Sequence, residues 1–373
     1  MAALTPQVVY DLETRMQAIV ENEYLDITSN LWFPKIVKVR PSESRREIIS
    51  WLLNTGTIED AGTKGGTMSF EDMVAVYTEY EARFQKGKGL KLTRAQLTDN
   101  DGQGFQFAAD WSGMQGSLFA YHPQKLAAKA ILNGETGLAY DGQPFFAGWD
   151  GAAHTGLHPY NPFNTSLGGY ANIFTGNSDS GAGYDYPGAC PIDDTVSVEQ
   201  AFINLSKVLA YIASIKLPNG EDPRFLRPMG LIGPPRMSAR MQQLTGAKFI
   251  AQAATSGGGS GDIEAVIKNW GQSTPIEAPE LAANMSYKLP DGTTVTGSND
   301  TCYLYCEQLS QRQLGGLVYV DREPFKITYY TGQGGGTGID AILDRADELE
   351  WHSSGRNVMG YGHPFVVFKL KRT

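Results

Sequence analysis

The longest hydrophobic pattern in the chain lies in residues 103–122, where apolar side chains recur three or four positions apart. This spacing is the period of one buried helix face. The positions that form it are Phe107, Trp111, Met114, Leu118 and Tyr121. The pattern predicts a helix of about twenty residues, roughly 30 Å long. Pro123 follows, and we expect the helix to break there because proline lacks a backbone N–H and its ring clashes with the preceding turn.

A second amphipathic pattern covers residues 5–25, and the chain becomes extended from 24 to 41. The apolar positions of the predicted helix are Val8, Leu12, Met16, Ile19 and Val20. Thr5 and Pro6 suit an N-cap and a first helical turn. Neither segment has a domain of its own. Each must therefore pack against either the body of the same chain or a neighbouring subunit.

The clearest alternation of apolar and charged residues precedes the long helix. Tyr80, Ala82 and Phe84 alternate with charged residues, residues 86–89 read as a turn, and Leu90 begins the return. This pattern predicts a β-hairpin. A two-stranded hairpin is marginal alone, so it needs a partner surface. Glycines at 56, 62, 65 and 66 make residues 45–73 a loosely built projection.

Residues 148–190 have no periodicity, and segments of this length are usually functional or ordered by a partner. His154 and His158 lie four positions apart near Asp150. Glycines and a proline around them leave no helix to hold the pair in register, so a metal site is the weaker interpretation.

The rest of the chain mixes helices and strands without a regular βαβ order, which predicts an α+β fold. Ser197 and Gln200 form a capping box. The predicted helices are 198–212, 235–244 and 263–270, with a helical turn at 339–345 and a flexible loop at 255–261. The predicted strands are 225–232, 301–307, 316–320, 325–330, 348–352 and 364–370.

Composition narrows the class of protein. Lys and Arg total 31 against 40 acidic residues, a net charge of −9. This balance argues against a protein that binds nucleic acid tightly through its phosphate groups. The sequence has no apolar run long enough for a membrane span and no secretory signal. Cys190, Cys302 and Cys306 cannot all pair and have no metal-ligand spacing. We expect them to be small buried residues in a protein that folds in the cytoplasm.

Catalytic motifs are absent from the sequence. The glycine clusters lack the pattern of a P-loop or a dinucleotide-binding turn, and there is no G-x-S-x-G or H-E-x-x-H motif. We expect His122 to make a helix-terminal contact and not to act as a base. We therefore predict a protein that is not an enzyme, with no catalytic, cofactor-binding or metal residues and no cofactor. A sugar-binding or other ligand-binding module remains an alternative.

An ordered series of local motifs resembles the Mu-like major head subunit family of tailed bacteriophages, whose capsid fold was first seen in phage Hong Kong 97. The motifs are Trp51-Leu52, residues 77–98, His122-Pro123, Tyr140-Asp141-Gly142-Gln143-Pro144-Phe145-Phe146, His158-Pro159 and residues 356–362. The sequence departs from the family in two places. The acidic run before the long helix is reduced to residues 98–101, and glycine-rich sequence replaces a tryptophan-centred segment near 57–67.

The resemblance implies a Hong Kong 97-like capsid fold and its division into parts. Residues 1–44 would be the N-terminal arm and 45–98 the E-loop region with its β-hairpin. Residues 99–190 and 323–355 would form the peripheral domain with the spine helix, and 191–322 and 356–373 the axial domain. The implied function is a major capsid protein that self-assembles into the icosahedral head shell and packages double-stranded DNA. A bacterial nanocompartment shell of the same fold, encapsulin-like, is the alternative.

The resemblance also implies partners. Many copies would assemble as pentamers and hexamers, with a portal vertex and a decoration protein. Because no extension precedes the arm, we expect a separate scaffolding protein. The shell would enclose DNA without sequence-specific binding and without contact with a membrane. It would be assembled in the host bacterial cytoplasm and located in the virion.

Three local expectations follow from the same resemblance. The hairpin and the 140–147 run would point outward toward other copies, and Pro123 would be a place to bend during shell maturation. Some shells of this kind carry lysine–asparagine cross-links. Lys86 and Lys88, at the predicted hairpin tip, are candidates for the lysine of such a cross-link. A solvated turn, or an ionic contact with a neighbour, is the simpler interpretation of the two lysines.

Overall fold

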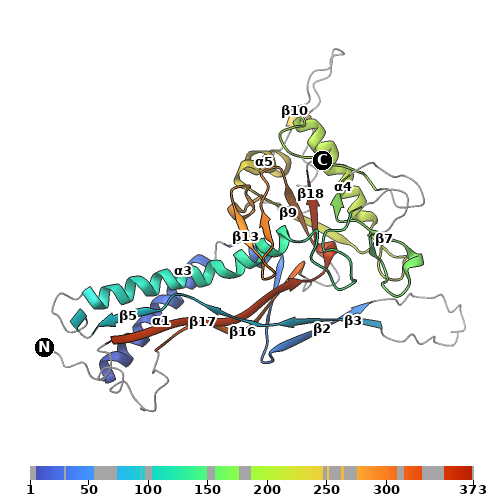
Figure 1. The fold of residues 1–373 in the computed structure, drawn as a ribbon. Coiled ribbons are helices and arrows are strands. Elements are labelled where there is room, and N and C mark those ends of the chain that lie inside the picture. The colour runs from blue at the N-terminus through green and yellow to red at the C-terminus, as the bar shows by residue number, and fades with distance from the viewer. Residues whose placement is uncertain are drawn as a thin grey trace, which may run out of the picture.

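A computed structural model describes residues 6–28, 31–53, 74–93, 95–96, 103–148, 156–175, 186–246, 250–251, 262–263, 275–308, 315–329 and 348–371. In Figure 1 the lower part of the molecule is elongated, with the long helix α3 (Gln103–Leu132) lying along a narrow sheet. The upper part contains the helices α4 (Val198–Ser214) and α5 (Ser238–Gly246) and a second sheet of shorter strands. Within the described residues, no helix has the length and hydropathy of a membrane-spanning segment.

The narrow sheet is built from strands far apart in sequence. Its members are β1 (Val37–Pro41), β16 (Leu317–Tyr329), β17 (Glu348–Tyr361), β4 (Arg83–Lys86) and β5 (Leu90–Thr93). β1 is parallel to β16, and β17 pairs antiparallel with β16 on one side and with β4 and β5 on the other. The predicted strands 316–320 and 325–330 are thus one strand, β16. The domain boundaries expected at 322/323 and 355/356 fall inside β16 and β17.

The predicted hairpin with a turn at 86–89 is wrong. β4 and β5 do not pair with each other, because both lie against β17, from Arg83 opposite Asn357 to Thr93 opposite Glu348. Between them the backbone N–H of Gly87 still bonds to the β17 carbonyl of Ser353, at 2.9 Å. Residues 83–93 therefore form one interrupted edge strand. The antiparallel pair of this region is instead β2 (Arg46–Leu53) with β3 (Val74–Glu81).

The long helix is present, but two details of its prediction are wrong. α3 has 30 residues and continues through Pro123 to Leu132 without a break. Its predicted buried face is mostly exposed, since only Trp111 of the five predicted positions is buried. The face that is buried instead carries small and polar side chains, namely Ala108, Ser112, Gln115, Ala120, Gln124, Ala127 and Ala128, together with Phe119 and Ile131.

The N-terminal helix α1 (Pro6–Thr28) confirms the predicted amphipathic pattern and packs on α3 of the same chain. Its buried residues Leu12, Met16 and Val20 share a core with Trp111, Phe119 and residues of β16 and β17. Of the two alternatives for this segment, packing on its own body is the one observed in the single chain.

The upper sheet has the order β12 (Ile276–Glu277), β9 (Leu226–Gly233), β15 (Cys302–Gln308), β18 (Val367–Leu370) and β8 (Ile173–Phe174). The helices α4 (Val198–Ser214) and α5 (Ser238–Gly246) pack beside β9. One half of the predicted capping box of α4 is confirmed, because the backbone N–H of Gln200 donates to Ser197 Oγ at 3.1 Å. The Gln200 side-chain amide donates to Asn204 Oδ1 at 2.9 Å. The fold is therefore α+β, as the irregular order of elements predicted.

Short elements complete the fold. The strands are β6 (His158–Pro159), β7 (Gly169–Tyr170), β10 (Ile250–Ala251), β11 (Asp262–Ile263), β13 (Ser286–Lys288) and β14 (Thr294–Thr296). The 3-10 turns are Phe33–Lys35, Thr165–Leu167, Pro235–Met237, Pro279–Leu281 and Pro364–Val366. The region 148–190, expected to lack regular structure, thus contributes β6, β7 and β8. The predictions for 255–261 and 339–345, and nearly all of 263–270, lie outside the described residues.

Candidate functional site

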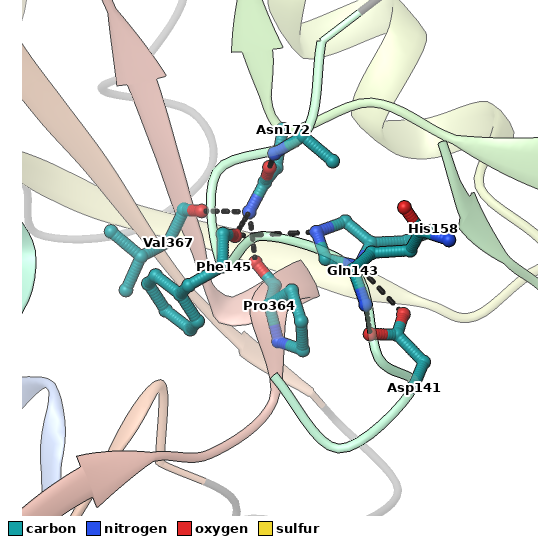
Figure 2. Close-up of polar contacts among 8 residues, drawn as sticks. Asp141, Gln143, Phe145, His158, Asn172, Pro364 and Val367 are labelled. Carbon is teal, nitrogen blue, oxygen red and sulfur yellow. Dashed lines mark hydrogen bonds and ion pairs between the residues drawn. The ribbon is translucent and has the colours of Figure 1, made fainter. Parts of the chain in front are cut away.

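A buried polar junction joins the end of α3 to the upper sheet, and Asn172 is its centre (Figure 2). The Asn172 side chain is fully buried. Its amide nitrogen donates to the carbonyl oxygens of Phe145, Pro364 and Val367 at 2.7, 3.1 and 3.3 Å. Its Oδ1 accepts from the backbone N–H of Ala147 at 2.8 Å. One side chain thus bonds to backbone groups of two segments more than 200 positions apart in the sequence. No periodic signal in the sequence marks this residue.

His158 and Asp141 form the second part of the junction. His158 Nδ1 lies 2.6 Å from Asp141 Oδ2, and Nε2 lies 3.2 Å from the carbonyl oxygen of Phe145. Both side chains are shielded from solvent. Because both ring nitrogens face oxygen acceptors, only the imidazolium can donate to both at once. The two nitrogens are therefore engaged within the chain, and neither is left for a metal ion. His154, the other half of the metal alternative, lies outside the described residues.

The 140–147 run points inward, so the expectation that it faces other copies is wrong. Phe145 and Phe146 are buried. Phe145 stacks on Tyr361 with ring centroids 5.0 Å apart, and Phe146 lies 5.7 Å from the ring of Tyr303. The run is a structural link between α3 and both sheets.

The inner face of the β2–β3 pair is fixed by aromatic contacts and one hydrogen bond. The Trp51 ring lies edge-on to His363 at 4.5 Å and stacks on Tyr140 at 5.7 Å. Tyr80 donates its hydroxyl to the carbonyl oxygen of Tyr361 at 2.6 Å. Burial of the His363 ring lowers its pKa to about 3, so the ring is neutral at pH 7.

His122 and the three cysteines, the remaining candidate residues, are packed inside the fold. His122 lies inside α3, not at its end, and its Nε2 lies 3.3 Å from Asn357 Oδ1. Burial lowers the pKa of His122 to about 4. The three cysteines are free and buried, which confirms that prediction. Burial raises the pKa of the Cys190 thiol to about 11 and those of Cys302 and Cys306 further, which makes them poor nucleophiles.

The two lysines discussed for cross-linking are exposed, but they do not lie at a hairpin tip. Lys86 ends β4 opposite Ser354 of β17, and Lys88 lies in the interruption before β5. The side chains of Asp193, Asp194 and Asp300 lie within 4.8 Å of one another, and Arg236 pairs with Asp194 at 3.1 Å. This arginine supplies a positive charge at the acidic cluster.

Large apolar side chains are exposed on two surfaces. On α3 they form one stripe, with exposed fractions of 50% for Phe107, 59% for Met114, 59% for Leu118 and 48% for Tyr121. On the β2–β3 pair, Ile48 and Tyr77 are 64% and 70% exposed. The register places both on the face opposite Trp51. Contiguous exposed apolar patches are typical of interaction surfaces.

Comparison with known proteins identifies the fold. No known family model matches the sequence, and no curated protein sequence matches it. The chain is similar to the mature capsid of bacteriophage PhiM1, with a TM-score of 0.51 and 11% identity over 92% of this chain and 87% of that one. It is likewise similar to the capsid of cyanophage P-SCSP1u, with a TM-score of 0.52 and 11% identity over 92% and 88% of the two chains.

The chain therefore has the α+β fold of Hong Kong 97-type capsid proteins, as the sequence motifs led us to expect. At 11% identity the likeness establishes the fold alone. The SrpI encapsulin of Synechococcus elongatus PCC 7942 matches with a TM-score of 0.40, which is too low to carry an argument.

Proposed function

We propose that this chain is the major capsid protein of a tailed bacteriophage and self-assembles into the icosahedral head shell that packages double-stranded DNA. The observation that carries the proposal is the pair of exposed apolar surfaces, on the β2–β3 pair and on α3, in a chain with a capsid fold.

The β2–β3 pair is packed against its own chain on one face only, and its other face is free to contact a second copy. Its inner face packs through Ile49, Trp51 and Tyr80 onto β16 and β17. Its outer face exposes Ile48 and Tyr77. The pair forms no backbone ladder with any other described strand, and Figure 1 shows it extending away from the centre of the molecule. A two-stranded ribbon is marginally stable alone, so a second copy that covers the outer face would stabilise it.

The stripe on α3 supports the same proposal. Phe107, Met114, Leu118 and Tyr121 recur with helical spacing on the side away from α1. In a monomer such a stripe would remain in water, at a cost of about 25 cal/mol per Å² of apolar surface. Contact with another copy, or with a scaffolding protein during assembly, would remove that cost.

The division into parts is proposed with revised boundaries. We assign residues 1–44 to the N-terminal arm and 45–98 to the E-loop region. The peripheral domain would contain α3 together with the whole of β16 and β17, because each strand continues through its expected boundary. At 322/323 the β16–β17 ladder shifts its register but resumes beyond it. The axial domain would contain α4, α5 and the upper sheet with β18.

The finer assignment to a Mu-like head subunit rests on the local motifs, above all residues 140–146 and 158–159. Under this proposal the copies form pentamers and hexamers, and a separate scaffolding protein, a portal vertex and a decoration protein take part. The net charge of −9 suits a container that confines DNA without binding it tightly. The shell would be assembled in the host bacterial cytoplasm, and the protein would be located in the virion, as a structural protein and not an enzyme.

Electron microscopy of the expressed chain, alone and with a co-expressed scaffold, tests the proposal. We expect shells, tubes or capsomers from the wild type. Leu118→Glu should abolish them because it places a charge in the exposed stripe, whereas Gln106→Glu, at an exposed polar position of α3, should not. A wild-type chain that stays monomeric under all conditions would contradict the proposal. Small closed shells that form without a scaffold and dock a cargo would favour the encapsulin-like alternative.

A further inference from the structure

A cavity of about 550 Å³ lies between α1, α3 and β16. Its apolar wall includes Val20, Leu25, Phe119, Pro123 and Phe325. Phe119 and Phe325 stack with ring centroids 4.5 Å apart. The volume is within the range of small-molecule sites, which are mostly apolar and contain a few polar groups.

One carboxylate, that of Asp321, lies in this apolar wall. Its Oδ1 is buried, and no described residue donates a hydrogen bond to it. Burial raises the pKa of this carboxyl group above its usual value. The other titratable groups that line the cavity are Glu21 and Tyr24 from α1 and Tyr319 and Lys326 from β16, whereas α3 contributes none. The lining thus contains two carboxyl groups, those of Asp321 and Glu21, and one amine, that of Lys326.

A carboxylate with one oxygen buried and without a hydrogen-bond donor is costly, and a cation placed beside it would recover part of that cost. Aromatic rings at the same site add an attraction for a cation through their faces. The apolar wall favours a ligand with a hydrophobic body. A cation and an apolar body on the same molecule therefore match the two features of the cavity together.

We propose that this cavity is a binding site for an organic cation carried on an apolar body, an arylalkyl ammonium or guanidinium. This chemistry has two sources, a free amine or the side chain of a lysine or arginine from a second copy. The site is complete within one chain, so the proposal does not depend on the proposed shell function.

The test uses benzylammonium as the probe and benzyl alcohol as its neutral counterpart, titrated into the purified full chain and followed by calorimetry or ligand-observed NMR. We expect benzylammonium to bind at least about tenfold more tightly than benzyl alcohol, in line with the strength of charged hydrogen bonds. Asp321→Asn, which keeps the shape of the side chain, should remove this preference. Glu323→Gln, which removes a nearby carboxylate that pairs with Arg356 outside the cavity, should keep it.

Equal binding of the two probes by the wild type, or no binding of either, would overturn the proposal, and neither result depends on how the variants fold. Sedimentation distinguishes the sources. If a second copy supplies the cation, saturating benzylammonium and Asp321→Asn should each shift the chain toward smaller species, while Glu323→Gln should not. If the ligand is a free amine, the probe should bind without changing the association state.

Discussion

Gly116 should control how closely α1 approaches α3. A Cβ atom at this position would lie 2.8 Å from the carbonyl oxygen of Val20 and 2.8 Å from Cβ of Glu23. At Gly113, one turn earlier on the same helix, the nearest atom to an added Cβ is Glu23 Cγ at 3.9 Å, an ordinary contact. The two glycines therefore form a matched pair, and we consider Gly116→Ala against Gly113→Ala.

The two substitutions should have opposite effects on stability. In a helix interior, alanine is favoured over glycine by about 1 kcal/mol, so Gly113→Ala should stabilise the docked helix pair by about that amount. At Gly116 the same gain is opposed by overlap with the backbone of α1. Overlap of this kind costs about 1–3 kcal/mol, and its upper end applies because the contact atom is backbone. We expect a net loss of about 1–2 kcal/mol at Gly116.

Hydrogen exchange of the α1 amides, followed by mass spectrometry, measures this local stability. Because 1.4 kcal/mol corresponds to a factor of ten, α1 should exchange about tenfold faster in Gly116→Ala and about fivefold slower in Gly113→Ala. Exchange in α4 should be unchanged in both variants and serves as the internal control. Equal exchange of α1 in the two variants would refute the packing of α1 on α3 at Gly116.

Three further outcomes can be checked by denaturant unfolding. Asn172→Ala removes hydrogen bonds from one buried side chain to four backbone groups and leaves the buried Ala147 N–H without its acceptor, so it should cost about 3 kcal/mol or more. Asn172→Asp should not rescue it because a carboxylate cannot donate to carbonyl oxygens. Gly360→Ala should lower the free energy of unfolding because its Cβ would lie 2.0 Å from the Tyr80 ring and displace it. The same substitution should lower it less when Tyr80→Ala is already present. The third outcome concerns pH. The pKa of His363 is lowered to about 3 in the fold, so the unfolded chain binds the proton first as pH falls below about 6.5. Stability should therefore drop by about 3 kcal/mol between pH 7 and 4.5, and His363→Gln should remove that part of the slope; an unchanged slope would contradict the buried neutral ring.

The sequence determined which segments are helices and strands wherever the signal was local. The amphipathic period of α1, the serine cap of α4 and the presence of a long helix from residue 103 depend on neighbours within a few residues. The full length of α3, ten residues beyond the expected end, did not follow from the sequence. The burial of the cysteines followed from residue type. The ordered local motifs also led to the correct capsid fold, although no single motif would have been sufficient.

Tertiary structure decided which face of α3 is buried. The large apolar stripe through Met114 and Leu118 and the small-residue face through Ala108 and Gly116 share the same helical period. The period fixes only the spacing along a face. α1 lies on the small-residue face because its backbone can come close there, next to Gly116. The stripe that looked like core is left for contacts outside the single chain.

Contacts between segments distant in the sequence also decided the strand pairing and the polar junction. Residues 83–93 contain a plausible local turn, but β17, more than 250 positions later, offers both halves a continuous set of backbone partners. Pro123 stays within the helix because packing on both sides of it outweighs one missing hydrogen bond. Asn172 acquires its role only when the C-terminal strand reaches it. Contacts between distant segments have no signature in a local pattern, so only the folded chain could determine them.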